Sequence, residues 1–181
     1  MVFYNFARAA DDIADSSKLN SNEKIKRLNL FAEAVKGNKV KIYKAEKLNK
    51  ICIKNKIKII YALNLLKAFK QDAKKKRYKN WSELIHYCKY SAVPVGRFVI
   101  DLHKEGKNSY KYSDPLCTAL QILNHIQDCK DDYKKIDRVY LPKTFLKKYN
   151  VELEQLNKSY IHKNLRLAIN DILKQTQELL N

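Results

Sequence analysis

The sequence has very few of the residues that let a chain turn sharply: three glycines and three prolines among 181 residues. Sheet proteins with many tight turns depend on both, because glycine reaches positive φ angles and proline fixes φ. Their scarcity predicts an all-α chain. The length and an apolar content of 45% suit one domain with its own core. Since there is no internal repeat and no domain boundary, residues 1–181 are predicted to form a single domain.

Paired cysteines and long apolar runs are also missing. The four cysteines, Cys52, Cys88, Cys117 and Cys129, have no C-x-x-C spacing and no histidine at a metal-site distance. This pattern predicts reduced thiols in a cytosolic protein. There is no signal peptide, and no apolar run approaches the roughly 18 residues that a membrane-spanning helix needs. We therefore expect a cytoplasmic protein whose membrane contact is at most peripheral.

Arginine is scarce among the basic residues: only six of the 37 are arginine, although the formal net charge is +18. Nucleic-acid sites favour arginine, because its planar side chain binds phosphates and bases in a fixed geometry. Here the lysines are scattered over nearly every segment, which is typical of a solvated surface. We expect no nucleic-acid partner, and a basic helical nucleic-acid binder remains the alternative.

The hydrophobic periodicity predicts helices along most of the chain. Ser21 is the predicted N-cap of the second helix, and Gly37 ends it. Pro94 is expected to kink the fifth helix, and Asp114 to cap the sixth, which starts at Pro115. The predicted ranges are 2–15, 22–36, 41–55, 57–73, 81–103, 115–133, 143–149 and 159–180.

The stretch FARAADDIAD in the first predicted helix carries two carboxylates four residues apart, Asp11 and Asp15. Helical spacing divides this helix into two stripes. The apolar stripe consists of Phe3, Phe6, Ala7, Ala10, Ile13 and Ala14. The polar stripe consists of Tyr4, Arg8, Asp11 and Asp15. A polar line of this kind is a set of weak ion pairs if it faces water, and a site if it faces a cavity.

The same arrangement recurs in LQILNHIQDCKDDY. Here the polar line consists of Gln121, Asn124, Asp128 and Asp132, beside an apolar stripe of Leu116, Leu120, Leu123 and Ile126. Carboxylate and amide oxygens suit hard cations such as Mg²⁺, which proteins hold with a few carboxylates plus the phosphates of a substrate. We therefore predict that Asp11, Asp15, Asn124 and Asp128 converge on one cavity, from two helices that pack against each other. None of the four histidines is spaced for a metal, although His125 lies next to Asn124.

Four segments carry a family resemblance: FYNFARAADDIADS, QDAKKKRY, HYCKYSAVPVGR and LQILNHIQDCKDDYKKIDRVYLP. In order and separation they resemble the motifs of the squalene and phytoene synthase family, and NHIQDC is most similar to its bacterial hydroxysqualene synthases of hopanoid biosynthesis. The resemblance implies an all-α isoprenoid (terpene) synthase bundle, with a central cavity lined by the two aspartate-rich helices.

The resemblance also implies roles for the matching positions. The implied catalytic residues are Arg8, Asp11, Asp15, Tyr87, Asp128 and Asp132. The implied Mg²⁺ ligands are Asp11, Asp15, Asn124, Asp128 and Asp132. The implied substrate contacts are Tyr4, Arg8, Gln121, Gln127, Arg138 and Tyr140, with Gln121 and Tyr87 lining the prenyl cavity. Gln127 stands where many relatives carry arginine, which argues against a phytoene synthase and leaves its phosphate contact open.

The implied reaction is the conversion of presqualene diphosphate to hydroxysqualene, with two or three Mg²⁺ ions around the diphosphate and no NADPH. The implied partners are an enzyme that supplies presqualene diphosphate and a downstream enzyme that forms squalene. Any contact of this chain with the inner membrane is expected to be peripheral. Two alternatives stay open: a head-to-head farnesyl or geranylgeranyl transferase that makes presqualene diphosphate, squalene or phytoene, and an inactive remnant of the family.

Family members carry about one helix before the first motif and several after the position of Asn181. The resemblance therefore covers a central fragment, and the bundle is expected to be incomplete at both ends. On this interpretation Phe3 and Phe6 lose their apolar cover and are exposed. The chain alone is then expected to be poorly stable, with low or no turnover.

Overall fold

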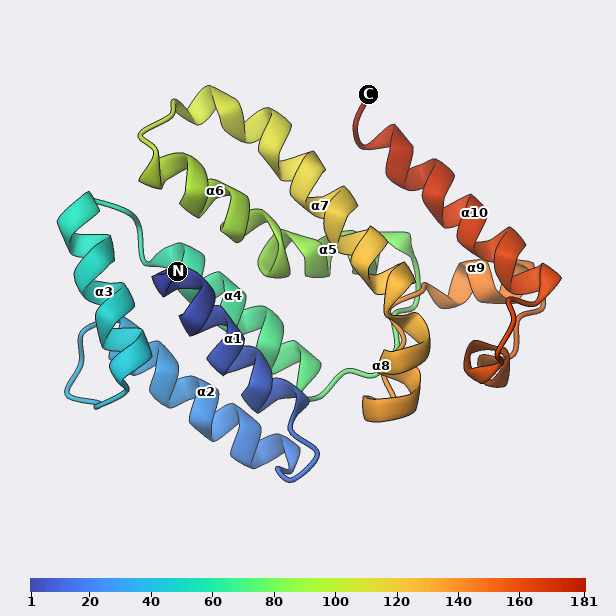
Figure 1. Cartoon of the computed structure of the whole chain (residues 1–181), viewed down its shortest axis with the longest axis horizontal. Helices are drawn as coiled ribbons and strands as arrows, with labels where there is room; N and C mark the ends of the chain where they lie inside the picture. The colour runs from blue at the N-terminus through green and yellow to red at the C-terminus, as the bar shows by residue number, and fades with distance from the viewer.

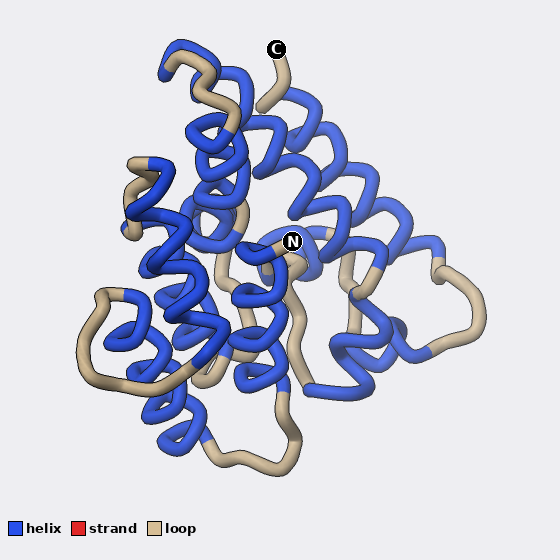
Figure 2. The backbone as a smooth tube through the Cα atoms, turned by 60° about the vertical axis from the view of Figure 1, so that its left-hand side comes forward, coloured by secondary structure: helices blue, strands red, loops and turns tan.

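A computed structural model describes residues 1–181, and every regular element in it is helical (Figure 1, Figure 2). The predicted all-α class is confirmed. The α-helices are α1 (Val2–Asp15), α2 (Ser21–Val35), α3 (Tyr43–Asn55), α4 (Ile60–Asp72), α5 (Trp81–Ser91), α6 (Val93–Leu102), α7 (Tyr110–Gln127), α8 (Cys129–Ile136), α9 (Lys143–Lys148) and α10 (Lys163–Glu178). Two short 3₁₀ helices are η1 (Lys107–Ser109) and η2 (Leu153–Asn157). None of the helices combines the length and the apolar character that a membrane span requires.

The second helix is capped one residue earlier than predicted. Asn20 accepts a hydrogen bond from the backbone N–H of Glu23, and the Glu23 carboxylate accepts one from the N–H of Asn20, both at 3.0 Å. This reciprocal capping box satisfies two backbone donors at the helix start. Ser21, the predicted cap, instead donates its hydroxyl to the carbonyl of Ala73 at 2.6 Å and so ties α2 to the end of α4.

Two helices predicted to be continuous are divided. The range 81–103 forms α5 and α6, which part at Ala92, and Pro94 lies in the first turn of α6, where its missing N–H costs nothing. The range 115–133 is part of α7 and α8, which meet at Asp128. Because α7 begins at Tyr110, Asp114 lies inside it and caps nothing. Its carboxylate pairs instead with the guanidinium of Arg97, at 2.9 Å.

A first core cluster lies among α1–α4, with Phe98 of α6 closing it (Figure 1). Phe3 stacks on Phe98 with ring centroids 4.1 Å apart, and Phe6 packs against Phe31. Phe3 and Phe6 are 9% and 0% exposed, so the expectation that both are exposed is wrong. The reason is that helices within this chain cover the apolar stripe of α1. All six residues of that stripe belong to the cluster or pack against it.

A second core cluster joins α5, α7, α9 and α10, with Ile122 of α7 and Ile172 of α10 among its fully buried side chains. It corrects the register predicted for α7, whose buried face consists of Thr118, Ala119, Ile122 and His125. The predicted stripe is largely outside: Leu116, Leu120 and Leu123 are 49%, 52% and 43% exposed. The cause is that α5 and α10 pack on the face of α7 that carries Ile122, whereas α6 covers another side. There Gly96 lies so close to Ser113 and Cys117 that a side chain at position 96 would collide with them.

Candidate active site

One cavity of about 450 Å³ collects nearly all the residues singled out from the sequence. Its walls come from α1, α4, α5, α6, α7 and α8 and from the segment after α8. The predicted residues that line it are Tyr4, Arg8, Asp11, Asp15, Tyr87, Gln121, Asn124, Asp128, Asp132, Arg138 and Tyr140. Gln127 does not line it. This side chain is exposed at the end of α7, because it points about 100° away from its neighbour Asp128 around the helix axis.

The polar lines of the two aspartate-rich helices, here called the two acid lines, line this cavity from opposite walls. The main packing partners of α1 are α2, α3 and α4, whereas those of α7 are α5, α6 and α10. The expectation that the two helices pack against each other is therefore wrong, and they face each other across the cavity. The junction between α7 and α8 at Asp128 does not interrupt the helical spacing of the second acid line. Asp128 donates its N–H to the carbonyl of Asn124 at 2.8 Å, and Asp132 donates to that of Asp128 at 2.9 Å, so the helical spacing continues.

Burial opposes the negative charge of two carboxylates of the cavity, those of Asp11 and Asp132. It raises the pKa of Asp11 to about 6, helped by the neighbouring charge of Asp15. Burial also raises the pKa of Asp132 to about 6, against a lowering effect of Arg138. Arg8 gives little relief, since it is exposed and shared between Asp11 at 3.3 Å and Asp12 at 3.1 Å. A cation in the cavity would favour the ionised carboxylates.

The donor set fits a divalent cation that is bound together with a ligand. It consists of oxygen atoms from carboxylates and one amide, which suit Mg²⁺. However, no three acidic, histidine or cysteine side chains lie close enough together to hold a metal ion by themselves. An ion held between the two walls would need further oxygens, from water or from a diphosphate, as is usual for Mg²⁺.

Arg138 is the central cation of the cavity floor. Its guanidinium is buried and donates to Asp15 Oδ1 at 2.8 Å, to the Tyr140 hydroxyl at 3.2 Å and to the backbone carbonyl of Asp72 at 3.1 Å. The Nε of Arg138 has no hydrogen-bond partner and lies 3.9 Å from Asp72 Oδ1. One donor of a buried cation therefore remains available.

Asp72 is a buried acid that the sequence analysis missed. It accepts hydrogen bonds from the hydroxyls of Tyr87 at 2.7 Å and Tyr140 at 3.0 Å. Burial raises its pKa to about 7, although Arg138 and both tyrosines lower it. The signal in the sequence was an acid at helical spacing from Phe69, within the apolar stripe of α4. A charged residue on a buried stripe usually has a buried partner.

His125 is the second missed residue. Its ring stacks on Tyr140 at a centroid distance of 3.6 Å and an interplanar angle of 14°, and its Nε2 lies 3.2 Å from the Gln121 amide nitrogen. Burial lowers its pKa to about 3, helped by the charge of Arg138, so the imidazole is neutral. Its place next to Asn124 in the sequence was the only available signal.

The segment that carries Arg138 and Tyr140 is held by the QDAKKKRY motif. Arg77 and Val139 form an isolated parallel bridge, and Val139 donates its N–H to the carbonyl of Lys76 at 2.9 Å. The Arg77 side chain bonds both the backbone carbonyl and the carboxylate of Asp137. This pairing explains how a loop can hold two buried cavity residues in fixed positions.

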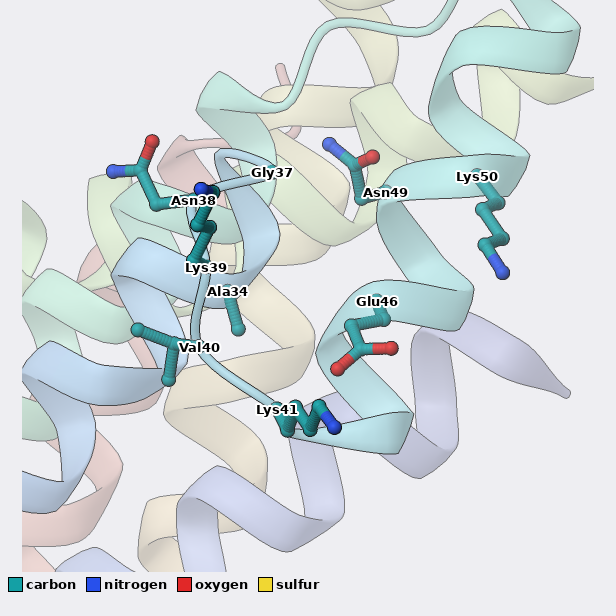
Figure 3. Close-up of a pocket in the computed structure, with 9 residues that line it drawn as sticks. All are labelled: Ala34, Gly37, Asn38, Lys39, Val40, Lys41, Glu46, Asn49 and Lys50. Carbon is teal, nitrogen blue, oxygen red and sulfur yellow. The ribbon is translucent and has the colours of Figure 1, made fainter.

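Other hollows in the surface lack such a constellation. The one at the turn between α2 and α3 is lined by lysines at positions 39, 41 and 50, all exposed (Figure 3). There Gly37 adopts a φ of 88°, and the Asn49 amide donates to the carbonyl of Val35 at 2.8 Å. These features explain the shape of the turn, and the hollow needs no ligand to account for it.

Comparison with known proteins agrees with the motifs. Relatives that match nearly all of this chain are hydroxysqualene synthases: that of Rhodopseudomonas palustris is 39% identical over 99% of this chain and 62% of its own length. That of Zymomonas mobilis is 38% identical over 99% of this chain and 61% of its own length. The chain thus spans about three fifths of these curated relatives.

Solved structures show the same fold. Squalene synthase HpnC from Alicyclobacillus acidocaldarius superposes with a TM-score of 0.81 and 27% identity, over 98% of this chain and 68% of that one. A ligand-bound dehydrosqualene synthase gives a TM-score of 0.83 over 98% of this chain and 62% of its own, at 22% identity. The family model described as squalene/phytoene synthase matches residues 1–181. The helical isoprenoid-synthase fold, the motifs in their cavity and this match over the full length agree, and the chain belongs to the squalene/phytoene synthase family.

Proposed function

We propose that this chain ionises presqualene diphosphate in the cavity and converts it to hydroxysqualene. The observation that carries the proposal is the meeting of two acid lines and a buried arginine at one cavity that also has an apolar wall. Leu65, Phe69 and Val95 form that wall and offer a surface to a prenyl chain. The likeness to proteins named hydroxysqualene synthase supports this choice of substrate and product.

The polar part of the cavity would bind the diphosphate. Arg138 already has its guanidinium fixed by Asp15 and Tyr140, and Arg8 and Tyr4 lie at the exposed rim of the same cavity. Asp11, Asp15, Asn124, Asp128 and Asp132 would hold Mg²⁺, which supplies positive charge to the diphosphate when it is bound. A fixed arginine costs no reorganisation as the leaving group gains charge.

The apolar and aromatic part would protect the carbocation. Tyr87 lines the cavity, and the negative face of such a ring would stabilise a cation. The ring of Tyr140 is instead stacked on His125 and Tyr78. The apolar wall would limit the access of bulk water, which would capture the cation before it rearranges. Capture of the rearranged cation by one water molecule gives the alcohol, and this step needs no reductant and hence no NADPH.

The proposed reaction implies neighbours on either side of it. An enzyme that couples two farnesyl units must supply presqualene diphosphate, and an enzyme that removes the hydroxyl must follow if squalene is the end product. We place the chain in the cytoplasm, with at most a peripheral contact at the inner membrane, because both its substrate and its product are lipids.

The test is to incubate the purified chain with presqualene diphosphate and Mg²⁺ and to analyse the lipid extract by mass spectrometry. We expect hydroxysqualene and one inorganic diphosphate for each turnover. Asp11→Asn should abolish Mg²⁺-dependent turnover and keep the helical circular-dichroism signal. Product from farnesyl diphosphate alone would favour head-to-head transfer instead. A folded chain that turns over neither substrate would be an inactive member of the family.

A further inference from the structure

Ser91, the last residue of α5, carries a buried hydroxyl that nothing in the protein satisfies. It lines the cavity and is 8% exposed, and its Oγ has no hydrogen-bond partner. Even the carbonyl four residues earlier, which serine hydroxyls in helices commonly use, does not accept from it. A buried hydroxyl without a partner costs about 1–3 kcal/mol. Such a group in a cavity wall indicates a bound polar molecule.

Ser91 lies between the hydrogen-bonded residues at the cavity floor and the apolar wall. Tyr87, Ser91 and Val95 follow one another at steps of four residues, and all three line the cavity. Tyr87 belongs to the hydrogen-bonded floor through Asp72, whereas Val95 is apolar. The Ser91 hydroxyl therefore lies where the reacting carbon chain would leave the diphosphate end.

A second polar group lies on the facing helix. The Gln121 amide nitrogen can only donate, so the bond at 3.2 Å makes His125 Nε2 the acceptor and leaves Gln121 Oε1 as a free acceptor. Stacking of His125 on Tyr140 fixes the pair. Helices α5 and α7 pack against each other, and the rings of Tyr87 and His125 are 5.7 Å apart. Ser91 and Gln121 each lie one helical turn from that contact.

We propose that Ser91 Oγ and Gln121 Oε1 bind the single water molecule that captures the rearranged carbocation, and that Ser91 thereby determines that the product is an alcohol. A buried water needs two to four polar partners, which these two groups begin to supply beside an apolar wall. His125 is a positioning residue that acts through Gln121. The inference rests on the proposed conversion of presqualene diphosphate.

The chemical step is balanced without a further reactant. The C–O bond to the diphosphate breaks, and both electrons leave with the diphosphate. The cation rearranges, and one cyclopropane C–C bond breaks as its electron pair forms a C=C double bond to the cationic carbon. A lone pair on the water oxygen forms the new C–O bond to the ring carbon that loses this electron pair. The proton that the water loses passes to the released diphosphate. The products are an alcohol and a protonated inorganic diphosphate, and nothing is oxidised or reduced.

Threonine and valine at position 91 give a matched test, because they have nearly the same size and differ by a hydroxyl. The variants Ser91→Thr and Ser91→Val are mixed, in excess, with presqualene diphosphate and Mg²⁺. A single turnover is then analysed for lipid products and inorganic diphosphate. Ser91→Thr should keep the alcohol as its main product. In Ser91→Val the alcohol formed per diphosphate released should fall about tenfold, the scale of one lost hydrogen bond, in favour of dehydrated hydrocarbons.

The control is Thr118→Val, which removes a buried hydroxyl of α7 that does not line this cavity and bonds the Asp114 carbonyl instead. It should leave the alcohol fraction unchanged. If Ser91→Val loses its helical signal, Ser91→Ala removes the hydroxyl without adding a methyl group and has the same expected product. Equal alcohol fractions in the threonine and valine variants would overturn the role of Ser91. Absence of diphosphate release from the unmutated chain would instead overturn the proposed function, and with it this inference.

Discussion

At the scale of single residues, the cavity contains two buried groups, Asp72 and His125, whose pKa values are shifted in opposite directions. Burial raises the pKa of Asp72 to about 7 and lowers that of His125 to about 3. A protonated Asp72 favours folding, and this contribution is lost as pH rises from about 4 to about 7. A neutral His125 also favours folding, and that contribution is lost as pH falls from about 6.5 towards 3. Between pH 5 and pH 7.5 the two effects have opposite signs.

Substitution of Asp72 and substitution of His125 should therefore change the pH dependence of the free energy of unfolding in opposite directions. In Asp72→Asn, the free energy of unfolding should rise between pH 5 and pH 7.5, relative to the unmutated chain, by about 2 kcal/mol. In His125→Gln it should fall over the same interval by about 2 kcal/mol. Urea denaturation at the two pH values, followed by circular dichroism, measures both. The same direction of change in both variants would contradict these assignments.

At the scale of helices, the sequence was informative where one apolar stripe stood alone. The predicted stripe of α1 contains all four of its buried residues, because most of its other residues are polar. In α7 the polar line has apolar residues on both sides, and periodicity cannot choose between Leu120 and Ile122 as the buried one. That choice is made by the packing of α5 and α10 on the face of α7 that carries Ile122. Asp72, Ser91 and His125 escaped for the same reason, since their roles depend on contacts between helices far apart in the sequence.

The register of α7 can be tested with two neighbouring substitutions. Ile122 is 1% exposed in the second core cluster, so Ile122→Ala should lower the free energy of unfolding by about 3 kcal/mol. Leu120 is 52% exposed, and Leu120→Ala should cost less than about 1 kcal/mol. Urea denaturation midpoints give both values. A larger loss for Leu120→Ala would restore the register expected from the sequence and refute the one in the structure.

At the scale of the whole molecule, net charge and local charge have opposite signs. The chain carries a formal charge of +18, yet five aspartates line one cavity: Asp11, Asp15, Asp72, Asp128 and Asp132. Buried charges interact more strongly than exposed ones, because water and salt screen them less. The chemistry of this molecule is therefore expected to follow the acid cavity, and the scattered lysines are expected to act as a solvated surface.

This separation predicts how the fold responds to ligands of the cavity. Mg²⁺ and inorganic diphosphate together should raise the melting temperature by about 5 °C when both are well above their dissociation constants. Mg²⁺ alone should raise the melting temperature less, because no three acidic side chains form a closed metal site. Diphosphate alone should also raise it less, because the negative charges of the cavity carboxylates repel it. Asp128→Asn should reduce the joint shift. Asp131 lies three residues further on and pairs with Lys135 in solvent. Asp131→Asn should therefore keep the full shift in melting temperature. If the two variants respond alike, the stabilisation is a bulk effect of salt, and the two acid lines are not the site at which Mg²⁺ and diphosphate bind.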